Sequence, residues 1–324
     1  MNLRKKILIS ILILILFSLW GIFAFGKNIS DFLFWYDMSQ KQQMLSAELS
    51  LEEKLWETRP TRDTKMPDLE ITAESVISVL IKDNGEERIL FEKSSDEVMP
   101  IASLTKLMTA WVVLEHYDLS EKITVSESAA SQYGEMGKLQ EGEIFPTEYL
   151  LYPLLMESSN GAAFALSNDY QGMTERNFVG LMNSEAKKIG LKDTFFDNPS
   201  GLDPEEAKTG MNYSTAADLA VFSKKLLEKP LVWEILSLPT YSLYGPELTN
   251  TNKFLLNGSG YWQSRVIGGK TGYTDKAGGC LLLALRAPKG QGILINIILG
   301  ADGRENRFDE MKKLVEWVKS AHKW

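Results

Sequence analysis

The stretch SVISVLIKDNGEERILF, residues 75–91, decides the fold class. Its apolar runs, Val76 to Ile81 and Ile89 to Phe91, are rich in the β-branched and aromatic residues that favour strands. Between them lies Asn84-Gly85, a pair typical of hairpin turns because both residues tolerate positive φ. We therefore predict an antiparallel hairpin with a type I′ turn at the start of a folded domain.

The other end of the chain repeats this strand pattern. Three apolar runs there predict strands, and Lys289-Gly290 predicts a turn between the last two. The three runs are Val266–Thr271, Cys280–Leu285 and Gly292–Leu299. After Asp302-Gly303 a helix with one apolar face is predicted to run to the end, and residues 101–235 have a mostly helical pattern. We therefore expect an α+β domain whose antiparallel five-stranded sheet is built from both ends of the domain and covered by helices.

The first residues predict a membrane anchor. Residues 7–26 carry no charge and follow the basic cluster Arg4-Lys5-Lys6. A helix of this length spans about 30 Å, the thickness of a bilayer core, and basic residues before it favour a cytoplasmic N-terminus. We predict a single-pass membrane protein with a cytoplasmic tail (1–6), a transmembrane signal-anchor (7–26), an extracytoplasmic stalk (27–69) and a folded domain (70–324). Cleavage of the segment as a signal peptide is the alternative, and it also exports the domain.

The composition excludes several classes of function. The 35 Lys and Arg against 43 Asp and Glu give a formal net charge of -8, and no basic stripe is present, so we expect no nucleic-acid partner. The single cysteine, Cys280, excludes an internal disulfide. With only His116 and His322 beside it, a zinc site of His and Cys ligands cannot be assembled. We expect no metal and no cofactor, so the chemistry must come from other side chains.

The first candidate motif is Ser103-Leu104-Thr105-Lys106, which opens a segment predicted to be a buried central helix. Ser103 and Lys106 are three residues apart and therefore share a face. Burial lowers the pKa of a lysine, which suits Lys106 as the proton acceptor for a serine nucleophile. The alternative is a serine helix cap followed by a solvent-exposed lysine. His116 is too far along the same helix to complete a Ser-His-Asp triad.

Two further motifs carry groups that fit this chemistry. Ser158-Ser159-Asn160 places a hydroxyl and an amide after an apolar helical stretch. Lys-Thr-Gly occurs twice, as Lys270-Thr271-Gly272 and as Lys208-Thr209-Gly210. The first copy ends an extended run, where Lys and Thr can line a cleft and bind a carboxylate while Gly lets a substrate backbone come close. The second copy lies in a polar loop, so we predict a surface lysine there.

The order Ser-x-x-Lys, Ser-x-Asn, Lys-Thr-Gly resembles the signature of penicillin-binding proteins and serine β-lactamases. Longer strings are similar to the D-alanyl-D-alanine carboxypeptidase family of low-molecular-mass penicillin-binding proteins, over about residues 70–322. These strings are Pro100–Ala110, Asn198–Leu202, Ser214–Ala220, Thr251–Lys253 and Gly269–Thr274. The resemblance implies a β-lactamase/transpeptidase-like fold. The chain departs from the family at Ser159 and Gly161, where Gly and Asp are common, and we expect no β-rich module after the catalytic domain.

The resemblance also implies an acyl-enzyme mechanism. Ser103 would attack the carbonyl of the penultimate D-Ala, and Lys106 would accept its proton. Ser158 would help return a proton to the leaving group. The backbone N–H groups of Ser103 and Tyr273 would form the oxyanion hole, which stabilises the charge that develops during acyl transfer.

The substrate that the resemblance implies is a peptidoglycan stem peptide ending in D-Ala-D-Ala. Asn160 would hold this peptide, Lys270 and Thr271 would recognise its terminal carboxylate, and Gly272 would allow its close approach. β-lactam antibiotics would act as covalent inhibitors. We therefore predict a serine-type D-Ala-D-Ala carboxypeptidase of cell-wall maturation. The alternatives are a D,D-endopeptidase that cuts cross-links, a β-lactamase, and a catalytically silent wall-binding protein.

Overall fold

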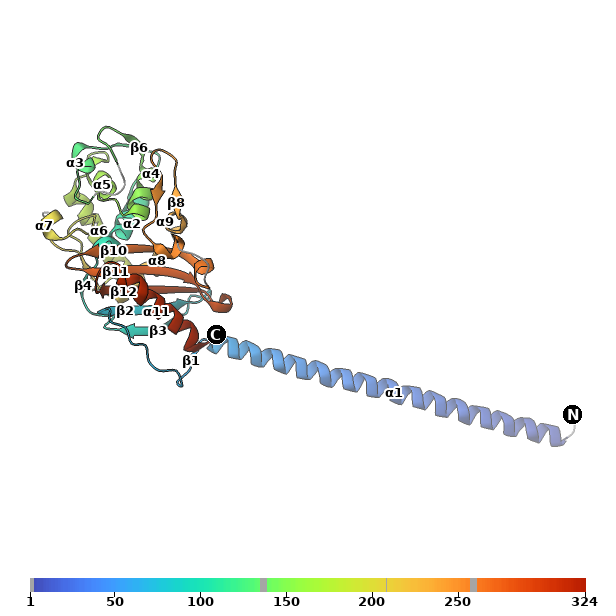
Figure 1. Ribbon diagram of the computed structural model, residues 1–324. Coiled ribbons are helices and arrows are strands. Elements are labelled where there is room, and N and C mark those ends of the chain that lie inside the picture. Colours follow the sequence, from blue (N-terminus) through green and yellow to red (C-terminus); the bar gives the residue numbers. More distant parts are fainter. Residues whose placement is uncertain (1–2, 135–138, 208, 257–260) are drawn as a thin grey trace. The chain divides into compact units, whose positions relative to one another are not determined.

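The computed structural model describes the backbone of residues 3–134, 139–207, 209–256 and 261–324 (Figure 1). The side chains of residues 3–9, 24, 27–32, 49–58 and 207 also lie outside this description. Lys208, the lysine of the second Lys-Thr-Gly copy, is therefore outside the described residues. The chain divides into two compact units, Met1–Thr61 and Arg62–Trp324, and each is described by itself.

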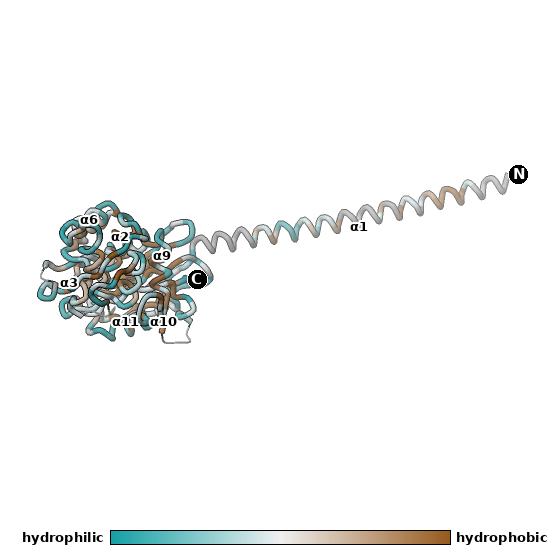
Figure 2. The backbone as a smooth tube through the Cα atoms, turned by 90° about the horizontal axis from the view of Figure 1, so that it is seen from above, coloured by the Kyte–Doolittle hydropathy of each residue, from teal (hydrophilic) through white to brown (hydrophobic). Residues whose placement is uncertain are grey.

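The first unit consists of α1 (Leu3–Thr58), a helix of 56 residues. The residues predicted as a polar stalk are thus helical as far as Thr58. Large apolar side chains between Ile11 and Phe25 are exposed along α1, and Figure 2 shows hydrophobic colour on this helix. Within the part of the chain whose side chains are described, no helix reaches the length and hydropathy needed to cross a membrane. The predicted anchor includes residues 7–9 and 24, which lie outside that part, and the predicted tail includes residues 1–2.

A five-stranded antiparallel sheet forms the centre of the second unit (Figure 1). Its order is β10-β11-β12-β2-β3, so two strands from the start of the domain join three from its end, as predicted. The strands are β2 (Ser75–Ile81), β3 (Glu87–Lys93), β10 (Val266–Thr274), β11 (Gly278–Arg286) and β12 (Ile293–Ala301). The pairing of β2 with β12, with Leu80 opposite Leu294, joins the two ends.

The hairpin between β2 and β3 differs from the predicted type I′ turn. Gly85 has a φ of 83°, whereas Asn84 is not among the residues with positive φ. The Gly85 amide donates to the Lys82 carbonyl at 2.9 Å, and the Lys82 amide donates to the Glu86 carbonyl at 2.9 Å. This three-residue loop needs only one left-handed residue, which Gly85 supplies. Asn84 instead accepts a hydrogen bond from the Glu86 amide through its side chain at 2.9 Å.

Helices cover both faces of the sheet. On one face, α11 (Asn306–Ser320) buries Met311, Leu314, Val315 and Val318 against β11 and β12. On the other face, α8 (Ala216–Leu226) contacts β2 and β12, and α9 (Pro230–Ser237) contacts β10. The C-terminal helix therefore has its predicted apolar face, but it ends at Ser320 and is followed by β13 (His322–Lys323).

The chain between β3 and β10 is helical over most of residues 101–235, as predicted, and contributes the buried helix α2 (Thr105–His116). Its other elements are β4 (Met99–Pro100), η1 (Ala102–Leu104), β5 (Lys122–Thr124), α3 (Glu127–Ala130), β6 (Ile144–Pro146), α4 (Thr147–Tyr152), η2 (Pro153–Glu157), α5 (Asn160–Phe164), η3 (Ala165–Asp169), α6 (Glu175–Ile189), α7 (Pro204–Ala207), β7 (Tyr213–Ser214), β8 (Thr240–Tyr241), β9 (Leu248–Thr249), α10 (Lys253–Leu256) and η4 (Gln263–Arg265). β1 (Thr61–Arg62) precedes the sheet, and η5 (Pro288–Gly290) forms the predicted turn between β11 and β12. The turn η1, the end of η2 and the strand β10 position the site.

Candidate active site

Ser103 lies in η1, a single 3₁₀ turn directly before α2. The preceding residue, Ala102, has a φ of 45°, a left-handed conformation that costs a residue with a side chain about 1–2 kcal/mol. The turn packs closely against β10. A Cβ added at Gly272 would lie only 3.0 Å from the Ser103 amide nitrogen and 3.2 Å from the Ile101 carbonyl oxygen. Close packing of η1 on β10 therefore fixes the position of Ser103, and Gly272 permits that approach.

Lys106 is fully buried one helical turn after Ser103. Its Nζ donates to Ser103 Oγ at 3.0 Å, to Asn160 Oδ1 at 2.7 Å and to the Ser200 carbonyl oxygen at 2.6 Å. These three acceptors match the three N–H groups of an ammonium, which a buried lysine needs. The alternative of a solvent-exposed lysine is thereby excluded, and the lysine nitrogen is directed at the serine hydroxyl.

The loop that carries the Ser200 carbonyl is held from within by buried amides. Asn198 Oδ1 accepts from the backbone amides of Ser200 at 3.1 Å and Gly201 at 2.7 Å, and Asn212 Nδ2 donates to the Asn198 carbonyl at 2.8 Å. Gly201 has a φ of 81°, and a Cβ there would lie 1.9 Å from the Ala102 carbonyl oxygen. The loop therefore sits directly on the nucleophile's turn. The sequence marked this string as a family resemblance but assigned it no role.

Ser158 and Asn160 enter the site from the end of η2. Ser158 ends this π-helical turn with φ 65° and ψ 33°, and its buried Oγ has no hydrogen-bond partner among the described residues. Asn160 Nδ2 donates to the Tyr133 carbonyl at 2.7 Å, which orients its Oδ1 toward Lys106. Ser159, where the chain departs from the family, caps α5 by accepting from the Ala162 amide at 2.9 Å. The departure thus has a local structural role.

The side chains of Lys270 and Thr271 have different environments, since neighbours on a strand point to opposite faces. Thr271 lines the cavity next to Ser103, and its Oγ1 lies 2.7 Å from Thr251 Oγ1. Lys270 is fully buried outside the cavity lining and donates to the Thr271 carbonyl at 2.9 Å. Burial, with the nearby positive charges of Lys106 and Arg307, holds the pKa of Lys270 well below its usual value.

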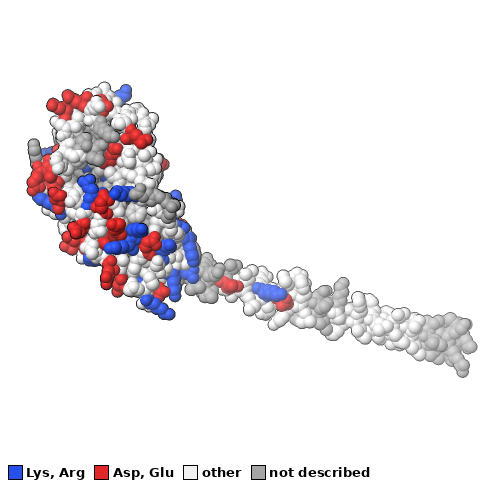
Figure 3. Space-filling view, viewed as in Figure 1, with Lys and Arg blue, Asp and Glu red and all other residues white. Residues whose placement is uncertain are grey.

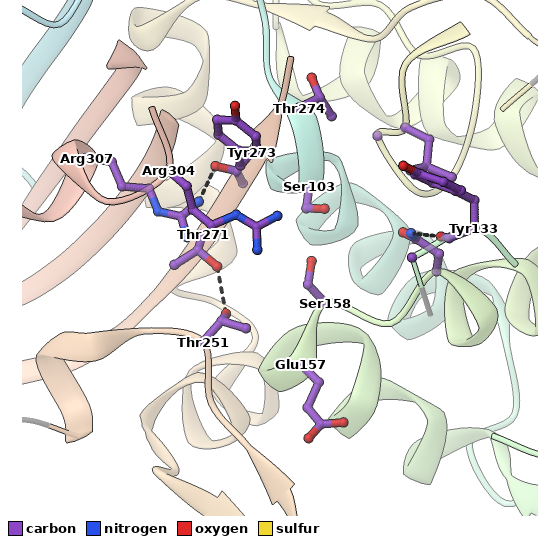
Figure 4. A pocket seen from close by; sticks show the side chains of 15 residues that line it. Ser103, Tyr133, Glu157, Ser158, Thr251, Thr271, Tyr273, Thr274, Arg304 and Arg307 are labelled. Carbon is purple, nitrogen blue, oxygen red and sulfur yellow. Dashed lines mark hydrogen bonds between the residues drawn. The ribbon is translucent and has the colours of Figure 1, made fainter. Parts of the chain in front are cut away.

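Figure 4 shows the cavity into which these groups converge, which has a volume of about 290 Å³. It is lined by Ser103, Tyr133, Gly134, Glu157, Ser158, Asn160, Gly201, Leu202, Thr251, Thr271, Gly272, Tyr273, Thr274, Arg304 and Arg307. Six of the eight residues predicted for the site line it, and the other two, Lys106 and Lys270, lie buried behind them. The three motifs, far apart in the chain, thus meet at one cavity.

Sequence reasoning missed two arginines in this lining. Arg307 is 6% exposed and donates through Nη1 to the Gly272 carbonyl. Burial, together with the neighbouring Arg304, lowers the pKa of Arg307 to about 10, so this side chain stays charged at neutral pH. Both arginines follow β12 by a few residues, and no local pattern there indicates that this part of the chain faces the serine.

The imidazole of His116 and the thiol of Cys280 lie away from the cavity. His116 Nε2 lies 3.1 Å from Glu185 Oε1, at the far end of α2 from Ser103. Cys280 is buried in β11, and burial raises the pKa of its thiol to about 12. Neither residue lines the cavity. His116 therefore contacts Glu185 and not the serine, and Cys280 is a buried residue of the central sheet.

Known proteins share this domain. The sequence pattern of the D-alanyl-D-alanine carboxypeptidase family matches residues 61–303. D-alanyl-D-alanine carboxypeptidase DacF of Bacillus subtilis is 33% identical over 261 residues, which cover 78% of this chain and 64% of DacF. A D-alanyl-D-alanine endopeptidase of Pseudomonas aeruginosa is 31% identical over 251 residues, which cover 75% of this chain and 77% of that protein. The chain thus spans somewhat less than two thirds of the length of DacF.

A solved structure shows the same architecture. The penicillin-binding protein of Listeria monocytogenes in its cefotaxime-bound form superimposes with a TM-score of 0.66 at 33% identity, covering 78% of this chain and 99% of that chain. The five-stranded antiparallel sheet and the helical region therefore form an α+β, transpeptidase-like fold, as predicted. With the sheet, the serine turn and the sequence similarity in agreement, this chain belongs to the D-alanyl-D-alanine carboxypeptidase family of serine hydrolases, which are homologous to the low-molecular-mass penicillin-binding proteins.

Proposed function

We propose that the protein is a serine-type D-Ala-D-Ala carboxypeptidase that forms an acyl-enzyme on Ser103 with peptidoglycan stem peptides. The observation that carries this proposal is the 3.0 Å contact between Lys106 Nζ and Ser103 Oγ. Two fixed acceptors, Asn160 Oδ1 and the Ser200 carbonyl, hold the lysine nitrogen in that place. A nucleophile and its base within hydrogen-bond distance, with the base oriented by further groups, are what covalent catalysis requires.

The acylation step follows from this arrangement. In its neutral form Lys106 keeps two N–H groups for Asn160 Oδ1 and the Ser200 carbonyl, and its lone pair takes the proton of Ser103. The Oγ then attacks the carbonyl carbon of the penultimate D-Ala. The bond from this carbon to the amide nitrogen then breaks, and the terminal D-Ala leaves with a proton passed through Ser158, whose Oγ lies buried at the cavity. Water subsequently cleaves the ester and frees Ser103.

The charge that develops on the carbonyl oxygen needs donors near Ser103. Its own backbone amide and that of Tyr273 are the candidates that the family resemblance suggested. Support comes from the tight contact of β10 with η1, where a Cβ at Gly272 would lie 3.0 Å from the Ser103 amide nitrogen. Donors fixed by backbone packing do not reorganise during the reaction, which is the basis of oxyanion stabilisation.

The relatives support an extracytoplasmic role on the cell wall, with β-lactams as covalent inhibitors. The family match carries the name carboxypeptidase, and the cefotaxime-bound relative is a penicillin-binding protein. Cleavage of cross-links is the second candidate, because the endopeptidase of Pseudomonas aeruginosa aligns over 77% of its own length. Attachment to the membrane through residues 7–26 stays a prediction of the sequence.

A labelling experiment with the full-length protein in detergent tests the nucleophile. A fluorescent penicillin is expected to label the protein and the Ser264→Ala variant, which loses an exposed hydroxyl outside the cavity. The Ser103→Ala variant is expected to stay unlabelled, and labelling that persists in it would reject the assignment. Mass analysis of products from a pentapeptide and from a cross-linked dimer then separates the two candidates: free D-Ala identifies a carboxypeptidase, and monomeric peptides identify an endopeptidase.

A further inference from the structure

A second hollow of the folded domain lies between α4 and the β8–β9 hairpin and has a volume of about 520 Å³. It shares no lining residue with the cavity at Ser103, and Figure 1 shows α4 beside β8. Four of the chain's 11 tyrosines and two carboxylates line this hollow, which we call the tyrosine groove: Tyr149, Tyr152, Tyr241, Tyr244, Asp118 and Glu148. The proposed acyl-enzyme chemistry uses none of them.

The rings of the tyrosine groove form a connected, partly exposed surface. Tyr152 and Tyr241 stack with ring centres 4.0 Å apart, and Tyr149 and Tyr244 meet edge to face at 5.0 Å. Tyr149 is buried, whereas Tyr244 is 52% exposed. Burial raises the pKa of Tyr152 to about 12, so its hydroxyl keeps its proton at neutral pH. The groove therefore offers a ligand both aromatic surface and phenolic hydroxyls.

The charges of the groove disfavour an anionic ligand. Among the described residues that line it, Asp118 and Glu148 are acidic and none is a lysine or arginine. Hydrogen bonds from the Ser120 side chain and amide, at 2.7 and 2.9 Å, lower the pKa of Asp118, so it stays charged at neutral pH. Figure 3 shows acidic and uncharged atoms over the region of α4 and β8 on the face in view, with basic atoms nearer the sheet. The groove thus suits a neutral or cationic ligand that donates hydrogen bonds.

A chain of amino sugars has the chemistry that this lining can bind. One face of a sugar ring carries C–H groups, whose small positive charge favours the negative face of an aromatic ring. Hydroxyl and acetamido groups at its edge donate hydrogen bonds, and bonds to a charged carboxylate are stronger than those to neutral acceptors. An ammonium group would also meet rings and carboxylates, but a volume of about 520 Å³ is in the range that holds a ligand of several rings.

Both walls of the groove continue directly into the cavity that holds the serine. Tyr152 ends α4, and η2 then leads to Ser158, six positions later and about 9 Å along a helix at 1.5 Å per residue. On the other wall, β9 leads to Thr251, whose amide donates to the Met156 carbonyl at 2.9 Å. An extended peptide covers about 3.3–3.6 Å per residue, so about three residues cover the same distance. A polymer held in the groove could therefore present a short attached peptide at the cavity.

We propose that the tyrosine groove binds the amino-sugar strand of peptidoglycan while a stem peptide of that strand lies at Ser103. This inference rests on the proposed function and adds a sugar-binding site outside the catalytic cavity. Tyr241 and Tyr244 supply the ring surface, and Asp118 and Glu148 accept hydrogen bonds from the sugar. Because both walls lead into the cavity, a bound strand raises the local concentration of its peptides near the serine.

The test measures sugar binding without any reaction. Calorimetry uses a tetramer of N-acetylglucosamine, which is neutral and carries no peptide, and the full-length protein in a detergent that has no sugar head group and so does not compete. Tyr244→Ala is expected to weaken binding about 2- to 12-fold, the range for one aromatic contact, and Tyr244→Phe to retain most of it. Tyr213→Ala removes a partly exposed ring of β7 outside the groove and should bind as the wild type does.

A trilysine peptide tests the cationic alternative in the same assay. Binding of the neutral sugar should be the same at low and high salt, whereas binding of an ammonium to the carboxylates should weaken at high salt. The inference is overturned if the sugar does not bind, if it binds equally well to the wild type and to Tyr244→Ala, or if trilysine binds more tightly than the sugar. Labelling of Tyr244→Ala by fluorescent penicillin at the wild-type rate shows that this variant is folded.

The consequence for catalysis is measured on sugar strands that carry pentapeptides. Tyr244→Ala should raise KM for these strands by the same factor as it weakens sugar binding, leave kcat unchanged, and leave KM for the free pentapeptide unchanged. Equal KM values for the strands in the variant and the wild type would also overturn the inference. Failure of penicillin to label the wild-type protein would instead reject the proposed acyl-enzyme and leave the sugar-binding result standing.

Discussion

Replacing Gly201 by alanine is expected to destabilise the protein in two ways, through a positive φ and through a clash with the backbone beside the nucleophile. Gly201 has a φ of 81°, and its added Cβ would lie 1.9 Å from the Ala102 carbonyl oxygen and 2.4 Å from the carbonyl carbon. Gly85, in the hairpin loop, has nearly the same φ of 83°, but a Cβ there meets nothing within 4 Å. Gly85→Ala is therefore a matched control that carries the conformational cost without the clash.

The magnitudes follow from these distances. Holding alanine in the left-handed region costs about 1–2 kcal/mol at either position. At Gly201 the contact must lengthen from 1.9 Å to an ordinary 3.4 Å, a shift of 1.5 Å between two backbone segments that no side-chain rotation can supply. Forced repacking of this kind costs a further ~1–3 kcal/mol. We expect Gly201→Ala to lower the free energy of unfolding by about 2–5 kcal/mol and Gly85→Ala by about 1–2 kcal/mol.

The same shift should reach the chemistry, because Ala102 directly precedes Ser103. A displacement of about 1 Å at a reacting group can slow a reaction roughly 100-fold. Stopped-flow measurement of acylation by a fluorescent penicillin, at a temperature where both variants are folded, should show this loss for Gly201→Ala and a wild-type rate for Gly85→Ala. Equal stability losses for the two variants, with unchanged acylation in both, would refute the packing argument.

The remaining predictions concern the duplicated tripeptide and the N-terminus. Lys270→Met should slow acylation about ten-fold, because the buried amine donates to the Thr271 carbonyl at 2.9 Å and its loss removes that contact from the strand that packs on the Ser103 turn. Lys208→Met should leave the rate unchanged, since the sequence predicts a surface lysine there, and equal effects of the two variants would contradict the choice between the copies. At the N-terminus, the full-length protein should stay with membranes after a high-salt wash, whereas a chain lacking residues 1–26 should be released. Release of an intact full-length chain by salt alone would contradict the predicted anchor.

The strands and the motifs could be predicted from the sequence because their signals are local. The apolar, β-branched runs on either side of Asn84-Gly85 indicate a hairpin whatever surrounds it, and the apolar runs from Val266 onward indicate three more strands. The predicted type I′ turn was wrong. Asn-Gly is also compatible with a three-residue loop, and the register of β2 on β3 selects that loop. The order of the three motifs likewise indicates the family from the sequence alone.

Only the tertiary structure decided which groups face one another. The Ser200 carbonyl lies 94 positions from Lys106 along the chain, yet it accepts one of the lysine's hydrogen bonds. Lys270 and Thr271 are adjacent in the sequence, but the strand directs one into the protein and the other to the cavity. Arg304 reaches the site because β12 pairs between β11 and β2, which brings the turn after β12 to the cavity. A sequence pattern records local periodicity, whereas these contacts depend on how distant segments pack, and that packing is settled only when the whole sheet and its helices have formed.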